Sequence, residues 1–157
     1  MVALVQVTAP AMEPLTIAEV LAQLLIDEGG QEPAPNAPTA SMASPAAAGN
    51  VDNGAHRYLV VFKTAFGNTQ AGVPSAAVTV ADKTVNGQIA VTGIPLGGSS
   101  VTARDLYRTK AGGDVYYLLG IITDNTTVGY TDNIADSALG AGSSAGACSA
   151  NRRLRFF

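Results

Sequence analysis

Residues 54–137 of this 157-residue chain carry short runs of β-branched and aromatic residues separated by turn signals, and this pattern restricts the fold more than any other feature. Runs of this composition are typical of strands. Asn86-Gly87 and Gly112-Gly113 lie between runs and favour tight turns. Short, regularly spaced strands of this kind indicate a small antiparallel β-sandwich. We expect strands at Tyr58–Thr64, Ala76–Val80, Gln88–Thr92, Val101–Arg108, Val115–Ile122 and Val128–Thr131.

Residues 1–30 contain one predicted amphipathic helix, residues 16–28. Thr16 and Glu19 have the spacing of a capping box, and Gly29-Gly30 ends the helix. A helix of about three turns is marginal alone in water, so it must dock on its own β domain or on another subunit. Its apolar face is the first predicted partner-binding surface and is centred on Val20, Leu21, Leu24 and Leu25.

The predicted β domain, residues 51–137, lies between two segments of low complexity. Residues 31–50 are rich in Ala, Pro and Ser and include four prolines, which argues against a packed element. Fully extended, this linker would reach roughly 60 Å, which favours a tether to a neighbouring molecule. Residues 138–157 begin as a Gly/Ala/Ser arm that is expected to be flexible.

The composition indicates a protein whose surface is partly buried by neighbouring molecules. Charged residues make up 13% of the chain and hydrophobic residues 47%, so the alternatives are an assembly subunit and a small soluble domain. The net charge of -3 gives no general attraction to nucleic acid, and sequence-specific binding is not expected. Because the sequence has neither signal-peptide features nor an apolar run of roughly 20 residues, we expect synthesis in a cytoplasm and no membrane partner.

No pattern of catalytic or metal-ligating residues is convincing. Residues 142–146 match the G-x-S-x-G nucleophile pattern by letter, but the strand-to-helix context that the chemistry needs is absent. With one histidine, His56, and one cysteine, Cys148, the chain has no recognisable metal cluster. Asp132 and Asp136 could help bind calcium, but a solvated turn is the favoured interpretation. We therefore expect no enzyme activity, no metal and no cofactor.

The second predicted partner-binding surface lies at residues 152–157. Arginine and aromatic residues are enriched at binding hot spots, and an arm can reach the groove of a partner. The alternative interpretation is a solvated tail. The segment consists of Arg152, Arg153, Leu154, Arg155, Phe156 and Phe157.

Two stretches resemble proteins of tailed bacteriophages. Residues 13–27, Glu-Pro-Leu-Thr-Ile-Ala-Glu-Val-Leu-Ala-Gln-Leu-Leu-Ile-Asp, resemble the opening helix of head–tail connector (adaptor) proteins. Residues 54–137, with Tyr-Leu-Val-Val-Phe, Leu-Tyr-Arg-Thr, Tyr-Tyr-Leu-Leu and Tyr-Thr-Asp, are similar to the fibronectin type III-like modules of phage structural proteins. Those modules often carry a tryptophan that this chain lacks, so Ile94 or Leu96 is expected to fill its place.

The resemblance implies a non-enzymatic virion protein with a fibronectin III/Ig-like β-sandwich. The leading hypothesis is a head–tail adaptor that forms a homo-oligomeric ring of about twelve copies at the head–tail interface and contacts the portal protein and tail or nozzle proteins. One alternative is a capsid decoration (cement) protein on the major capsid protein. Another is a carbohydrate-binding tail module, whose aromatic platform would be Tyr116, Tyr117 and Tyr130.

Overall fold

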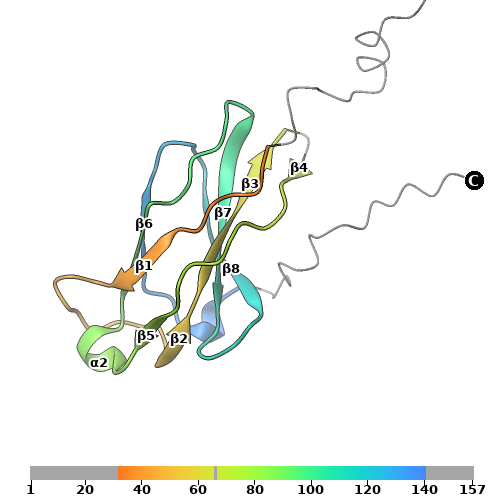
Figure 1. Cartoon of the computed structure of the whole chain (residues 1–157). Coiled ribbons are helices and arrows are strands. Elements are labelled where there is room, and N and C mark those ends of the chain that lie inside the picture. Colours follow the sequence, from red (N-terminus) through yellow and green to blue (C-terminus); the bar gives the residue numbers. More distant parts are fainter. Residues whose placement is uncertain (1–31, 66, 141–157) are drawn as a thin grey trace, which may run out of the picture. The chain divides into compact units, whose positions relative to one another are not determined.

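The computed structural model of the protein describes residues 32–65 and 67–140, and these residues form a mainly β structure (Figure 1). Strands account for 40% of it and helices for 6%, and every strand pair is antiparallel. This confirms the prediction of a mainly β chain with antiparallel sheets. A three-stranded sheet has the order β1 (Thr39–Met42), β6 (Ile89–Thr92) and β9 (Gly129–Asp132), and β2 (Gly54–His56) pairs with β5 (Val78–Val80). A four-stranded sheet has the order β4 (Gly67–Asn68), β3 (Tyr58–Thr64), β7 (Val101–Thr109) and β8 (Tyr116–Ile122).

Strands β3 and β7 form the centre of the four-stranded sheet. β3 is built almost entirely from β-branched, aromatic and leucine residues, which fit a pleated surface that is buried on both faces. It pairs with β7 from Tyr58 opposite Arg108 to Thr64 opposite Val101. β7 pairs in turn with β8, and the register shifts between Leu106 and Tyr107. The two strands therefore fix the positions of the side chains discussed below.

Both larger sheets contribute to one hydrophobic core. Side chains alternate along β3, so that Tyr58, Val60 and Phe62 enter this core while Leu59 and Val61 lie on the opposite face. β6 and β7 supply Ile89, Val91 and Leu106, each fully buried. Burial of a side chain of this size contributes about 1.5–3 kcal/mol, so this cluster is the main source of stability.

The two residues expected to fill the place of the missing tryptophan differ in burial. Ile94 is 1% exposed and belongs to the core, whereas Leu96 is 51% exposed.

The predicted linker, residues 31–50, differs from expectation because it includes strand β1. This strand pairs with β6 from Thr39 opposite Thr92 to Met42 opposite Ile89. Ala40 and Met42 pack against the core, which gives the segment an apolar face that its composition did not reveal. Prolines are tolerated there because they flank the strand, and because β1 lies at the edge of its sheet.

Two helical elements were not expected. Asn86-Gly87 does not form a hairpin turn but ends a one-turn helix, α2 (Lys83–Asn86), at whose start the Asp82 carboxylate accepts a hydrogen bond from the Thr84 amide at 2.9 Å. A 3-10 helix, η1 (Asp136–Ala138), spans the junction of the predicted β domain and the predicted arm, and Leu139 packs against the core. The predicted helix at residues 16–28 and the remainder of the arm lie outside the described residues. Among the described residues, no helix is long and apolar enough to cross a membrane.

Candidate functional site

A buried arginine, Arg108, occupies the core beside strand β9. Strand alternation places Arg104, Leu106 and Arg108 on the same face of β7. The guanidinium of Arg108 is fully buried, and its Nη1 donates to the Asp132 carboxylate, which is also fully buried. The Tyr58 hydroxyl donates to the same carboxylate oxygen at 2.7 Å. Because a buried charge is tolerated only when it is paired and hydrogen-bonded, this arrangement is a structural requirement of the fold.

From Arg108 the contacts continue toward the surface. Arg108 Nη2 donates to Asp136 Oδ1 at 2.7 Å, and Asp136 Oδ2 accepts from the Ala111 amide at 2.8 Å. The Asp136 amide donates to Asp52 Oδ2 at 2.9 Å, and Asp52 Oδ1 pairs with Lys83 Nζ at 2.6 Å. We call these residues, with Tyr58 and Asp132, the Arg108 network. It joins β3, β7 and β9 to the loop before β2 and to α2.

The only histidine of the chain borders this network. The ring of His56 is fully buried between two carbonyl oxygens, with Nδ1 3.0 Å from Thr109 O and Nε2 2.8 Å from Asp52 O. Both ring nitrogens therefore face backbone carbonyls of the protein itself, and His56 has a structural position.

A second buried arginine, Arg104, organises the loop between β8 and β9. Its guanidinium donates to three backbone carbonyls, those of Pro95, Asp124 and Thr127. Nη2 also lies 3.2 Å from the carboxylate of Asp124, which caps the amides of Thr126 and Thr127 at 2.7 Å each. Arg104 thus satisfies carbonyls that the loop would otherwise leave without donors.

These contacts shift the pKa values of three side chains, Asp52, Asp124 and Tyr58. The hydrogen bond from Lys83, followed by that from the Asp136 amide, lowers the pKa of Asp52 below its ordinary 3.8. The backbone amides of Thr127 and Thr126 hold the pKa of Asp124 far below the same value. Burial, and then the nearby Asp132 charge, raises the pKa of Tyr58 well above 10.0. Asp52 and Asp124 therefore remain ionised, and Tyr58 remains neutral, at neutral pH.

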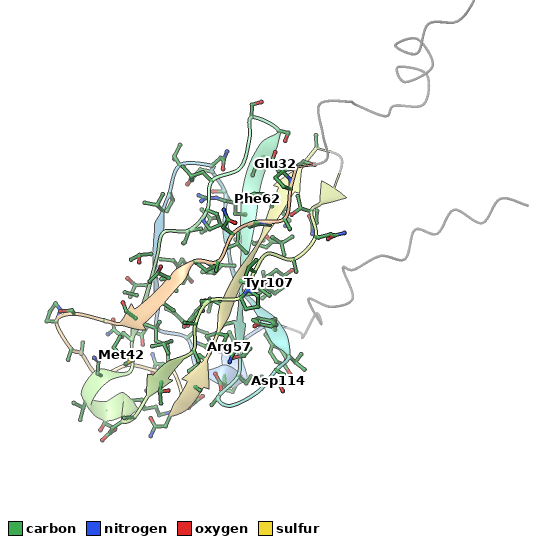
Figure 2. All side chains as sticks on the ribbon, in the orientation of Figure 1. Glu32, Met42, Arg57, Phe62, Tyr107 and Asp114 are labelled. Atoms are coloured by element: carbon green, nitrogen blue, oxygen red, sulfur yellow. The ribbon has the colours of Figure 1, made fainter. Side chains whose placement is uncertain are left out.

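The other face of the four-stranded sheet carries a small aromatic cluster. Leu59 and Val61 form its buried floor, with Ala71, Tyr107 and Tyr116 packed around them. Figure 2 labels Tyr107 together with Arg57, which is exposed and interacts electrostatically with Tyr116. We call Leu59, Val61, Ala71, Tyr107 and Tyr116 the tyrosine face. Charges border this face, because Asp105 lies opposite Val61 and pairs with Lys63 Nζ at 3.1 Å.

The partner-binding residues predicted from the sequence all lie outside the described residues. These are Val20, Leu21, Leu24 and Leu25 of the predicted helix, and Arg152, Arg153, Leu154, Arg155, Phe156 and Phe157. Residues 142–146 and Cys148 also lie outside. The hypothesis that these segments bind partners stays a prediction.

Asp132 and Asp136 do not lie in a solvated turn. Their carboxylates are 0% and 14% exposed, and both accept hydrogen bonds from Arg108. The favoured interpretation of a solvated turn is wrong because a cation on a distant strand draws this loop onto the core. Within residues 32–65 and 67–140, no group of His, Cys, Asp and Glu side chains could hold a metal ion.

The three tyrosines of the carbohydrate-platform hypothesis do not share one face. Tyr116 belongs to the tyrosine face, whereas Tyr130 packs against the main core. Tyr117 lies under the Lys110 ammonium, which is 4.6 Å from the ring centre. A sugar-stacking platform from these residues therefore has no structural support.

Arg104 and Arg108 are the residues that the sequence analysis missed. A signal was present, since period two places both of them on the same face as Leu106, and that residue is buried. The acceptors, however, come from residues 95, 124–127 and 132–136, which no local pattern connects to β7.

No family model matches this sequence, and comparison with curated proteins and with solved structures found no match.

Proposed function

We propose that the protein is a non-enzymatic structural component of a tailed-bacteriophage particle, and specifically a head–tail adaptor that forms a ring on the portal. One observation carries the non-enzymatic part of this proposal. The two buried arginines of the described residues are held by the protein's own groups: Arg104 by three carbonyls and Asp124, and Arg108 by Asp132 and Asp136. A catalytic site would leave charged side chains free to face a substrate, whereas these two arginines hold loops of the protein itself.

The proposed fold is a fibronectin type III-like sandwich of the three- and four-stranded sheets. Two observations support it. One core cluster draws residues from both sheets, as face-to-face packing requires. The segments that resemble the phage modules also lie on strands, with Tyr58–Phe62 in β3, Leu106–Thr109 in β7 and Tyr130–Asp132 in β9.

The described residues begin and end at anchored positions. The first of them, Glu32, accepts hydrogen bonds from the Gly98 amide at 2.6 Å and the Ser100 hydroxyl at 3.0 Å. At the last of them, the Gly140 amide donates to Leu118 O on β8 at 3.2 Å.

In the proposed assembly, about twelve copies form a ring at the head–tail interface, a number that rests on the family resemblance. Arg152–Phe157 docks on the portal protein, and the apolar face of residues 16–28 binds a neighbouring subunit or the portal. Tail or nozzle proteins bind the face of the ring that lies away from the portal. The virion-level alternative is a capsid decoration protein, in which the same segments contact the major capsid protein.

The docking role of residues 152–157 is tested by deletion. Particles are assembled with a chain that lacks residues 152–157 and, in parallel, with a control that lacks residues 141–146, which removes the same number of residues but keeps the Arg/Phe segment. We expect the first variant to fold, with an unchanged far-UV circular dichroism spectrum, and to be absent from purified particles, whereas the control is incorporated. Normal, infectious particles that contain the first variant would contradict the docking role.

A further inference from the structure

The segment that follows β9 is fastened to the domain almost residue by residue. The Asn133 side chain accepts a hydrogen bond from the Asn50 amide at 2.7 Å. The Ile134 amide donates to Asp132 Oδ1 at 3.0 Å, and its carbonyl accepts from Arg108 at 2.9 Å. Ile134 and Leu139 pack against the core, and the Gly140 amide reaches β8.

Asp136 lies at the centre of this segment and makes its most concentrated set of contacts. Its two carboxylate oxygens accept from different donors, Arg108 Nη2 and the Ala111 amide, and its own amide donates to Asp52. The carboxylate is 14% exposed and its partner guanidinium is fully buried. Charge-assisted bonds of this kind are about twice as strong as neutral ones, so Asp136 dominates the attachment.

The segment is nevertheless peripheral to the cooperative core. The ladder of β9 ends with Asp132 opposite Ile89, and the residues beyond it are held by side-chain contacts, by a single 3-10 turn and by the one backbone bond from Gly140 to Leu118. Ile134 and Leu139 are only partly buried, whereas the core residues of β3, β6 and β7 are buried completely. Segments held in this way open with a lower free energy than the strands on which they lie.

We propose that residues 133–140 form a clasp, a unit that opens separately from the β domain and fixes the point at which the chain beyond Gly140 leaves it. Asp136 is the positioning residue that keeps the clasp closed. The functional meaning of the clasp rests on the proposed function, which gives residues 152–157 a partner to bind. A closed clasp holds the chain at Gly140 against Leu118 on β8. When the clasp opens, the residues it releases lengthen the connection between the β domain and residues 152–157.

Asp136→Asn tests the clasp in the full chain. The amide has nearly the same shape but one acceptor oxygen, so either Arg108 Nη2 or the Ala111 amide then faces an NH2 donor. We expect hydrogen exchange at the amides of Ile134, Asp136, Ala138 and Gly140 to become about 10- to 100-fold faster, as the loss of a hydrogen bond to a charged group implies. Exchange in β3 and β7 stays at the wild-type rate.

Asp82→Asn is the matched control. It makes the same chemical change at a carboxylate that caps α2, where asparagine is an equally good cap, and we expect no change in residues 133–140. Unchanged exchange in residues 133–140 of the Asp136→Asn protein would overturn the proposal. A rise spread equally over β3 and β7 would do the same, because it would show that the segment opens only with the whole domain.

A second measurement keeps the proposal testable if Asp136→Asn does not fold. In the wild-type protein, exchange is followed at increasing, sub-denaturing urea concentrations. We expect the amides of residues 134–140 to depend on urea more weakly than those of β3, because local opening exposes less surface. Equal dependence would overturn the clasp. These measurements use the isolated protein, so their failure leaves the virion proposal standing, and absence from particles leaves the clasp standing.

Discussion

Replacing Arg108 with methionine should be among the most destabilising single changes in the described residues. Methionine preserves most of the length of the side chain but removes the charge, so that Asp132, which is 0% exposed, loses its cation. The carboxylate keeps hydrogen bonds from the Tyr58 hydroxyl and the Ile134 amide, and these only partly offset the loss. Breaking a buried pair in this way costs about 3–5 kcal/mol.

That cost is large relative to the whole stability of a domain of this size, which is about 5–15 kcal/mol. It corresponds to a fall in Tm of roughly 15–30 °C. The assay is thermal and urea unfolding of the full chain, followed by circular dichroism. Arg57→Met is the control, because Arg57 is exposed, and it should change stability by less than about 0.5 kcal/mol.

The double variant Arg108→Met/Asp132→Asn separates the buried charge from the loss of packing. Asparagine needs no countercharge, so the double variant should be more stable than the sum of the two single losses predicts, by about 2 kcal/mol. Two results would refute the reasoning: an Arg108→Met protein within about 1 kcal/mol of wild type, or single losses that simply add in the double variant.

Three further predictions follow from the same structure. Because the folded-state pKa values of Asp52 and Asp124 lie below 3.8, their stabilisation is complete above about pH 4 and is lost as the pH falls further; a Tm that is constant below pH 4 would contradict this. Because the folded-state pKa of Tyr58 lies above 10.0, its contribution is complete below pH 10 and is lost as the pH rises, and ultraviolet titration should show it ionising only as the domain unfolds, whereas ionisation in the folded protein near pH 10 would count against it. Gly49→Ala would place its Cβ 2.2 Å from a facing carbonyl oxygen and should cost about 1–3 kcal/mol in urea unfolding, while Gly113→Ala, whose nearest neighbour would be 3.4 Å away, should be close to neutral; equal stabilities would show that the close approach is easily relaxed.

The longest strands were predictable because their sequences are locally consistent. Tyr58–Thr64 was predicted with the observed bounds, and β7 extends one residue beyond the expected Val101–Arg108. Both combine β-branched and aromatic residues with period two. β1 was not predictable, because Thr-Ala-Ser-Met has little strand propensity and is stabilised by pairing with β6, about fifty residues later.

The buried arginines show a second limit of local patterns. An arginine on the buried face of a strand violates the simple apolar pattern, so its position is explained only by its acceptors. For Arg108 these lie 24 to 28 residues along the chain, on β9 and in the clasp. The helix at residues 16–28 and the Arg/Phe segment at 152–157 lie outside the described residues, so their roles stay predictions from the sequence.

The most direct test of the central proposal is the copy number and position of the protein in purified phage particles, measured by quantitative mass spectrometry together with low-resolution imaging. The adaptor proposal predicts about twelve copies at a single vertex, where the head meets the tail. Hundreds of copies spread over the shell would contradict the adaptor role and identify a decoration protein. Absence of the protein from particles would contradict the virion proposal itself.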